Sequence, residues 1–485
     1  MPLCLLANQS VNRLQSHALL TLLLYSFYTL ATPHLHFSYI AYSSPIYTLL
    51  FTLHCAHFKH QQRHLFLHTL SQLHSGELAG IKRLTLSENL REFPLEILSL
   101  ADSLEALDLS NNQMDTLPKE IRQLHQLKII FASNNHFEIL PEVLGQCANL
   151  EMVGFKSNHI TLVPENSLPA KLRWLILTDN KIETLPNSLG ERPRLQKLAL
   201  AGNRLTALPD TTTKLHNLEL LRISANQLDA FPEQLLDLPK LAWLAFAGNP
   251  FNRLVDSSEN ALSHTLNSAE DNCTDNHSAN SVPEISSSSF TIQHLLGQGA
   301  SGVISAATWN IDQSQFPNDV AVKIFKGEVT SDGYPQDELQ VCLKAGDHPS
   351  LIKPLAQVNE TGYLALIMEL IPAHYRNLGL PPSLQSCTRD TFPEGFVLSS
   401  EQIHKIIAQM QNVFEHLHAN HICHGDLYAH NTLFDEEANI IFGDFGAATM
   451  YHMLSSQQQE KIKQIEQRAL DYFIEDLWSV YSERV

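Results

Sequence analysis

Several short motifs in the C-terminal part of the chain hold residue types that suit chemistry on a bound phosphate. A G-x-G-x-x-G stretch begins at Gly297, a lysine (Lys323) ends the apolar run 320–322, and Asp426 and Asp444 lie further on. Glycines let backbone N–H groups approach phosphate oxygens, and carboxylate oxygens are ligands that Mg²⁺ prefers. This set could bind a nucleotide with its cation and place a carboxylate beside a reacting hydroxyl group.

The glycine motif alone would equally suggest a dinucleotide-binding fold. That fold would require a helix directly after the glycines and an acidic residue about 20 positions on, whereas here a short β-pattern, Val320-Ala321-Val322, leads to Lys323. We therefore interpret the stretch as a hairpin over phosphates. The residues predicted to bind the nucleotide in this stretch are Leu296, Gly297, Gln298, Gly299, Ala300, Ser301, Gly302, Val303 and Ile304.

Taken in order, the glycine stretch, V-A-V-K, H-G-D-L-Y-A-H-N and D-F-G resemble the protein kinase superfamily. The resemblance implies an α+β fold of two lobes, with ATP and Mg²⁺ as cofactors. It implies that Lys323 contacts the α- and β-phosphates and is held by an acidic residue on a helix of the small lobe. Glu338 is the candidate, and Glu328, only five residues past the lysine, is the competitor. The stretch Met368-Glu369-Leu370-Ile371 resembles the hinge that meets adenine, so Glu369 and Ile371 are included in the predicted nucleotide site.

The same resemblance assigns the transfer chemistry. It implies that Asp426 accepts the proton of the acceptor hydroxyl and that Asn431 and Asp444 hold Mg²⁺. Two positions depart from the pattern: Gly425 stands where most kinases have an arginine that senses activation-loop phosphorylation, and Tyr428 stands where a lysine usually neutralises the γ-phosphate. These departures predict unusual activation and weaken the preference for serine or threonine over tyrosine.

The segment after Asp444 is unusual for such a domain. It contains neither an A-P-E motif nor any proline. We expect a short loop, one amphipathic helix over 462–481 and no ordinary platform for docking a peptide, so the substrate would be delivered by another part of the chain.

That other part is a repeat. From residue 81 onward the pattern L-x-x-L-x-L-x-x-N-x-L-x-x-L-P returns eight times, with asparagines 22 or 23 residues apart from Asn89 to Asn249. It resembles the leucine-rich repeat family. The leucines of a short strand point inward, the asparagine turns the chain, and a Leu-Pro step such as Leu117-Pro118 or Leu185-Pro186 ends the strand. No unit buries its apolar face alone, so the fold class is an α/β leucine-rich-repeat solenoid with a curved parallel sheet, followed by the two-lobed kinase-like domain.

The residues between the inward leucines form the concave surface in two columns. The first column reads Arg83, Ala106, Ile129, Met152, Trp174, Lys197, Leu220, Trp243, and the second reads Thr85, Asp108, Phe131, Gly154, Ile176, Ala199, Arg222, Ala245. Apolar and aromatic side chains on a surface that would meet solvent favour protein binding. The predicted partner-binding residues are Phe131, Met152, Trp174, Ile176 and Trp243. As an alternative, Trp243 caps the solenoid or contacts the following domain.

Charge and composition limit the class of ligand and indicate the domain boundaries. With 32 Lys and Arg against 51 Asp and Glu, the chain has a net charge of −19, which disfavours nucleic acid as a ligand. Residues 1–76 contain no acidic residue and no confident membrane span, and we expect a non-globular extension. The predicted domains are 1–76, a repeat domain 77–251, a flexible polar linker 252–289 and a kinase domain 290–485.

These patterns together predict a cytoplasmic, ATP-dependent protein kinase, with serine or threonine as the expected acceptor, whose repeats recruit a protein substrate or regulator. The seven scattered cysteines indicate no disulfide framework, and the oligomeric state is left open. Two alternatives remain: a nucleotide-binding scaffold that transfers nothing, and a small-molecule phosphotransferase on the same fold.

Overall fold

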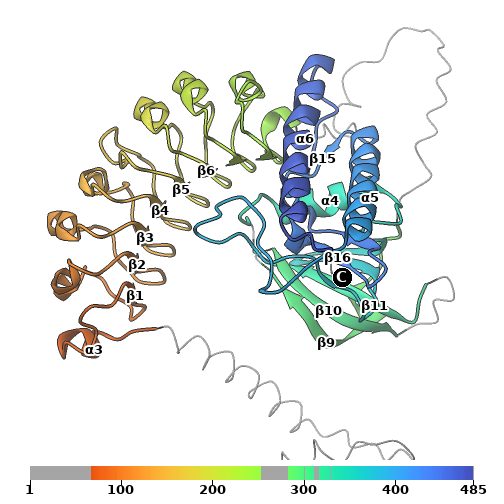
Figure 1. Ribbon diagram of the computed structural model, residues 1–485, viewed down its shortest axis with the longest axis horizontal. Coiled ribbons are helices and arrows are strands. Elements are labelled where there is room, and N and C mark those ends of the chain that lie inside the picture. Colours follow the sequence, from red (N-terminus) through yellow and green to blue (C-terminus); the bar gives the residue numbers. More distant parts are fainter. Residues whose placement is uncertain (1–66, 253–281, 300, 311–315, 328, 484–485) are drawn as a thin grey trace, which may run out of the picture. The chain divides into compact units, whose positions relative to one another are not determined.

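The computed structural model describes residues 67–252, 282–299, 301–310, 316–327 and 329–483 (Figure 1). These residues belong to one compact unit, which contains both the repeats and the C-terminal half. None of its helices is long and apolar enough to cross a membrane.

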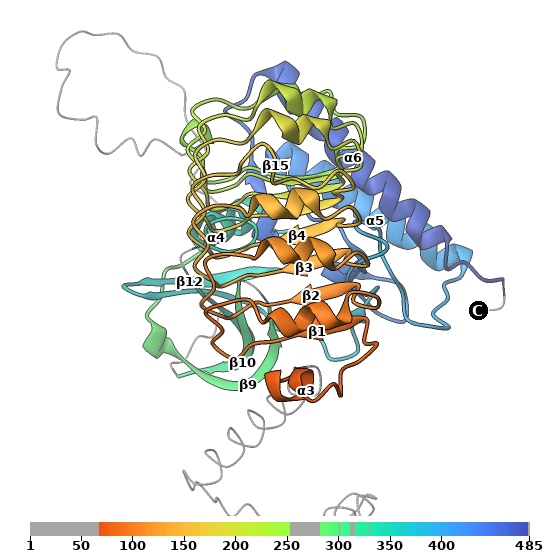
Figure 2. The same ribbon diagram turned by 90° about the vertical axis from the view of Figure 1, so that its left-hand side faces the viewer.

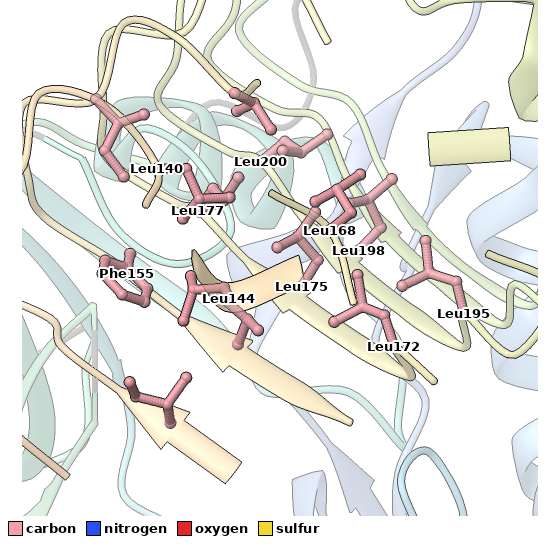
Figure 3. Close-up of a cluster of buried hydrophobic side chains, with 14 of the residues drawn as sticks. Leu140, Leu144, Phe155, Leu168, Leu172, Leu175, Leu177, Leu195, Leu198 and Leu200 are labelled. Carbon is pink, nitrogen blue, oxygen red and sulfur yellow. The ribbon is translucent and has the colours of Figure 1, made fainter. Parts of the chain in front are cut away.

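The repeats form one curved parallel sheet of eight strands, in sequence order from β1 to β8. The strands are β1 (Arg83–Thr85), β2 (Ala106–Asp108), β3 (Ile129–Phe131), β4 (Met152–Gly154), β5 (Trp174–Ile176), β6 (Lys197–Ala199), β7 (Leu220–Arg222) and β8 (Trp243–Ala245). Leucines from neighbouring repeats, such as Leu175 and Leu198, pack between the sheet and the convex side (Figure 3). The predicted solenoid is confirmed.

Short 3₁₀ helices cover the convex side, as Figure 2 shows for successive repeats. They are η1 (Leu95–Leu100), η2 (Lys119–Gln123), η3 (Glu142–Gln146), η4 (Asn187–Glu191), η5 (Asp210–Lys214) and η6 (Glu233–Leu235). Each follows a proline, because proline cannot continue the strand ladder and its fixed φ suits the start of a helical turn. The predicted role of the Leu-Pro steps is therefore confirmed.

The strand register confirms both predicted concave columns. Arg83 pairs with Ala106, Ala106 with Ile129, and so on to Leu220 with Trp243. Consecutive strands are in parallel register, so each column is a straight row of side chains across the sheet.

The asparagines form the predicted ladder from the second repeat onward. Asn203 is typical: its Nδ2 donates to the carbonyls of Leu177 and Leu200, both at 2.9 Å, and its Oδ1 accepts from the N–H of Ile182 at 3.1 Å. One buried amide thus satisfies three backbone groups of two repeats. Asn89, in the first repeat, is exposed and has a φ of 56° instead.

Asn203→Ala should lower the free energy of unfolding by about 1–3 kcal/mol per backbone group left without a partner. Urea denaturation followed by circular dichroism measures the change. Asn89→Gly is the matched control, because it alters the same motif position outside the ladder and keeps the positive φ. Equal losses for the two variants would contradict the role given to the ladder.

The structure departs from the predicted boundary at residue 76. Residues 67–76 pack on the first repeat: helix α3 (Leu70–His74) begins with a capping box between Thr69 and Gln72, and Leu73 is buried in the solenoid core. Composition misled the boundary, because this segment is as poor in acidic residues as residues 1–66. The latter lie outside the described residues.

The small lobe of the C-terminal half is a five-stranded antiparallel sheet in the order β12-β13-β11-β10-β9 with one helix. Its elements are β9 (Phe290–Gln298), β10 (Gly302–Trp309), β11 (Asp319–Phe325), α4 (Pro335–Ala345), β12 (Pro354–Glu360) and β13 (Tyr363–Glu369). Most of the predicted linker lies outside the described residues, but its end is attached to this sheet: Ile285 N–H donates to the Gln357 carbonyl at 2.9 Å.

The large lobe contains two long helices, α5 (Ser400–Ala419) and α6 (Ser456–Trp478), and short strand pairs. The strands are β14 (Arg376–Asn377), β15 (Ile422–Cys423), β16 (Thr432–Phe434), β17 (Ile440–Phe442) and β18 (Thr449–Met450). Both helices begin with a serine capping box. The predicted final amphipathic helix is confirmed, although α6 begins six residues earlier than expected.

Helix α6 and the last repeat share one hydrophobic core. Tyr451, Ile462 and Ile465 are buried in the same apolar cluster as the leucines of the repeats. On the polar side of this contact, Arg468 Nε donates to the Leu241 carbonyl at 2.8 Å. The helix therefore covers the open end that a solenoid would otherwise expose.

Candidate active site

A cleft of about 570 Å³ lies beneath the β9–β10 hairpin. Its lining contains most of the predicted nucleotide-binding residues: Leu296, Gly297, Gly299, Ser301, Gly302, Ile304, Lys323, Glu369 and Ile371. Gln298 and Val303 do not line it, and Ala300 lies outside the described residues. Successive strand residues point to opposite sides of a sheet, which explains why Val303 points away from the cleft between Gly302 and Ile304. At Gly302 a Cβ would lie 2.5 Å from the Ile324 carbonyl oxygen, so only glycine fits.

Lys323 and Glu338 form an ion pair inside this cleft. Helix α4 places Glu338 in its first turn, and both residues are buried. Burial alone would lower the pKa of Lys323, but the carboxylates of Glu338 and Asp444 outweigh it and raise that pKa. The two carboxylates therefore favour the charged form of the lysine, while burial raises the pKa of Glu338 itself. The prediction of Glu338 agrees with this placement, while the competitor Glu328 lies outside the described residues.

Asn431 and Asp444 line this cleft, and Asp426, which lies outside its lining, is hydrogen-bonded to Asn431. The amide Nδ2 of Asn431 donates to Asp426 Oδ2 at 2.8 Å and to the Asp426 carbonyl at 3.1 Å. That leaves Asn431 Oδ1 for a cation, and Asp444 lines the same cleft in a left-handed conformation with φ 58°. An amide oxygen beside a carboxylate fits Mg²⁺. No cluster of three or more His, Cys, Asp or Glu side chains that could hold a metal occurs among the described residues.

One residue of the site, Arg222 of the repeats, was not predicted from the sequence. Its Nη2 contacts Asp426 Oδ1, and its Nε donates to Asp332 Oδ1 at 2.7 Å. The side chain is only 4% exposed, so the pairs are shielded from water. Arg222 was placed in a concave column beside Ala199 and Ala245 in the adjoining repeats, and a lone buried arginine among such small neighbours is the signal that could have indicated a partner.

Gly425 explains how the repeats approach the catalytic loop. Its φ is 69°, and a Cβ there would lie 2.5 Å from the Leu244 carbonyl oxygen of the last repeat. Any larger residue would separate the two parts. The N–H groups of His424 and Gly425 both donate to Glu466 Oε1 of α6, at 2.7 and 3.1 Å. The departure from the usual arginine thus accommodates the repeat backbone.

Tyr428, the second departure, is also matched by the repeats. Its ring is stacked on Trp243 with centroids 5.3 Å apart, and Trp243 is stacked on Tyr472 of α6 at 5.5 Å. Trp243 Nε1 donates to the Leu427 carbonyl at 3.0 Å. Trp243 is therefore buried in a contact with the following domain, as the alternative prediction for it stated. The prediction that Trp243 is an exposed anchor for a partner protein is wrong.

The other predicted partner residues are also affected by this contact. Met152 and Trp174 are buried with Cys387, and the indole Nε1 of Trp174 donates to Cys387 Sγ at 2.7 Å. Ile176 packs at the edge of the same cluster, and Phe131 is half-buried over Gly154. The prediction that Met152 and Trp174 are free to bind another protein is wrong, because the chain's own segment 381–387 covers them. The periodicity of the sequence indicates which face of the repeats is apolar, but it does not indicate what covers that face.

Burial strongly affects the charge state of the Asp426 carboxyl group. Burial raises the pKa of Asp426 to about 7, the Arg222 guanidinium opposes the rise, and the carboxylates of Asp332 and Asp444 add to it. A proton acceptor with a pKa near neutrality is suited to general-base work at physiological pH.

Comparison with known proteins agrees with this geometry. Residues 290–465 match the model described as protein kinase domain, and residues 103–124 and 193–251 match models described as leucine-rich repeat. A tyrosine-protein kinase receptor TYRO3 of Gallus gallus is 24% identical over 201 residues, covering 40% of this chain and 23% of the relative. A probable myosin light chain kinase of Dictyostelium discoideum is 25% identical over 164 residues, covering 33% and 47%.

The chain thus spans less than half the length of either curated relative. Among solved structures, a leucine-rich repeat protein of Leptospira interrogans is 25% identical with a TM-score of 0.26, covering 37% of this chain and 63% of that one. Three findings agree: the matches to the family models, the parallel sheet of the repeats, and the two-lobed fold around Lys323 and Asp426. The chain therefore consists of leucine-rich repeats followed by a protein kinase domain, the architecture of a leucine-rich repeat kinase.

Proposed function

We propose that this chain transfers the γ-phosphoryl group of ATP to a serine or threonine hydroxyl group of a protein. The observation that carries the proposal is the grouping of the Lys323–Glu338 pair with Asn431 and Asp444 around one cleft, with Asp426 hydrogen-bonded to Asn431. Phosphoryl transfer needs positioning and charge neutralisation more than covalent chemistry, and these residues supply both.

ATP would lie in the 570 Å³ cleft. Lys323 and the open backbone around Gly297 and Gly299 suit its phosphates, and the strand end at Glu369 suits its adenine. Mg²⁺ held by Asn431 and Asp444 would neutralise charge on the phosphates. Asp426 would accept the proton of the acceptor hydroxyl.

Serine or threonine is the acceptor that the geometry favours. Tyr428 and Trp243 fill the space next to the Asp426 loop with stacked rings. The short side chain of serine or threonine needs a shallower pocket beside Asp426 than the side chain of tyrosine does. Phosphoamino-acid analysis of the labelled product distinguishes the two acceptors.

We propose that recruitment of a protein partner falls to the first repeats. The concave residues of β1 to β3 include Arg83, Ile129 and Phe131, none of which is fully buried. The later repeats are committed to the kinase domain. We also propose a cytoplasmic location, which fits the use of ATP and the buried free thiols of Cys147, Cys342, Cys387 and Cys423.

Asp426→Asn tests the enzymatic proposal. The variant keeps the shape and one oxygen of the side chain but cannot accept the proton, so transfer of radiolabel from ATP should fall by at least about a hundredfold. Asp471→Asn, on the exposed side of α6, is the matched control and should leave transfer unchanged.

A scaffold that binds nucleotide without transferring it is the second candidate, favoured by the pairing of Asp426 with Arg222. Binding of Mg·ATP without incorporation in the parent chain would establish it. Incorporation into small hydroxyl compounds only would instead indicate a small-molecule phosphotransferase.

The pH dependence of transfer follows from the raised pKa of Asp426. Only the ionised carboxylate can accept a proton, so the rate should be half-maximal near the pKa of about 7, approach its maximum at higher pH, and fall about tenfold per pH unit on the acidic side. Burial also raises the pKa of Asp390 to about 7, and its Oδ1 accepts from Ala429 N–H in the same loop. Asp390→Asn separates the two groups: an unchanged profile assigns the titration to Asp426, and loss of the acidic limb would contradict that assignment.

A further inference from the structure

A second cavity, of about 630 Å³, lies between the repeats and the catalytic loop. The nucleotide cleft and this cavity adjoin, because Asp332 and His430 line both. Asp426 lines the second cavity, whereas Lys323, Asn431 and Asp444 line the first. The proton acceptor thus lies at the boundary between a space suited to ATP and a space walled by the repeats.

The wall supplied by the repeats carries three basic side chains. Lys156, Lys197 and Arg222 all line it. Arg222 is neutralised by two carboxylates, but no carboxylate of the described residues lies within ion-pair distance of Lys197, whose Nζ is 5.1 Å from the centroid of the Trp174 ring. Burial and the neighbouring Arg222 lower the pKa of Lys197, and the carboxylates of Asp426 and Asp332 offset this only in part.

Two buried polar atoms in the same wall have no hydrogen-bond partner. They are Oγ1 of Thr178, a side chain 1% exposed, and Nη1 of Arg222. Buried polar groups are nearly always satisfied, so orphaned donors that line a cavity point to a ligand. Thr178, Arg222 and Lys197 line the same cavity, all three can donate hydrogen bonds, and two are cations, so an anionic group is the ligand that this wall suits.

We propose that this cavity is the acceptor site and that it takes a short peptide segment in which the acceptor hydroxyl is flanked by an acidic side chain. The hydroxyl lies at Asp426, and the carboxylate lies at Lys197, Thr178 and Arg222 Nη1. The volume falls within the range of about 300–1,000 Å³ of ordinary ligand sites, and the repeats provide the substrate selection that a missing docking platform would otherwise give. This inference rests on the proposed protein kinase activity.

Three peptides test it on the full chain. They share one serine, and its flanking residues are glutamate, glutamine or lysine. The glutamate peptide should have a KM about tenfold below that of the glutamine peptide, and the lysine peptide should be the poorest substrate. Lys197→Met keeps the stem that packs on Trp174 but removes the charge, and should erase the difference between the glutamate and glutamine peptides with a smaller effect on kcat. Lys214→Met, on exposed η5, is the matched control and should preserve the difference.

Equal KM values for the three peptides in the parent chain, with transfer intact, would overturn the inference and leave the proposed function standing. Fluorescence anisotropy with a labelled glutamate peptide keeps the two apart when transfer is absent. Binding by the parent chain that Lys197→Met weakens about tenfold would support the site although the enzymatic proposal fails, and absence of binding would overturn both. Phosphorylation of free glycerate in preference to every peptide would also overturn the inference, since the site would then serve a small molecule.

Discussion

Trp243→Ala is expected to lower the free energy of unfolding by about 3–5 kcal/mol and to abolish most phosphoryl transfer. The substitution leaves a cavity between two tyrosine rings, Tyr428 and Tyr472, that now lie on either side of the indole. It also leaves the Leu427 carbonyl without the indole N–H. Since Leu427 directly follows Asp426, loss of packing at residue 243 should reach the catalytic carboxylate.

Urea denaturation and radiolabel transfer measure the two effects on the same preparations. Trp478→Ala, which removes a tryptophan 38% exposed on α6, is the matched control and should cost far less of both. Trp243→Phe should recover much of the stability through stacking but not the hydrogen bond. Normal transfer by Trp243→Ala would show that the catalytic loop holds its shape without the repeats.

Arg222→Met is expected to cost about 3–5 kcal/mol of stability, because removing one partner of a buried ion pair leaves the other charge unpaired. Here two carboxylates, Asp426 and Asp332, would be left. The guanidinium now opposes the effect of burial on the pKa of Asp426, so that pKa should rise above about 7 in the variant. The acidic limb of the rate profile should therefore move to higher pH, and transfer at pH 7 should fall.

The shift of the pH profile separates this role from a purely structural one. Arg222→Lys should recover part of the rate, since an ammonium group can neutralise one carboxylate but cannot bridge two as the planar guanidinium does. Arg204→Met, an exposed arginine of the preceding repeat, is the control. Faster transfer by Arg222→Met would reverse the interpretation and make the ion pair an inhibitory contact.

The parts of this fold that could be predicted are those in which residue identity follows directly from backbone or phosphate chemistry. The 23-residue period placed every strand of the solenoid, since only one register stacks the leucines and the asparagines together. The motif around Asp426 and the lysine at 323 were found because their roles tolerate few other side chains. Glu338 followed from the distance a chain needs to leave a strand and return along a helix.

The contacts between the two halves could not be predicted. Arg222 and Asp426 are 204 positions apart, and no periodicity relates them. The apolar columns indicated that the concave face is covered by other protein. The same apolar pattern in the sequence is expected whether a segment of the same chain or another protein covers this face. Gly425 and Tyr428 were recognised as departures from the family, and only the backbone of Leu244 and the ring of Trp243 explain them.

The shared core of α6 and the last repeat has a consequence for how the molecule is held together. Ile462 and Ile465 of α6 complete the apolar interior of the solenoid. Removing either half would therefore expose buried apolar side chains of the other half to water, as happens when two subunits of an obligate dimer separate. The covalent connection through residues 253–281 then serves mainly to ensure that the two halves are synthesised together and in equal numbers. A partner bound to the first repeats would therefore be connected to the C-terminal half through one continuous set of packed apolar side chains.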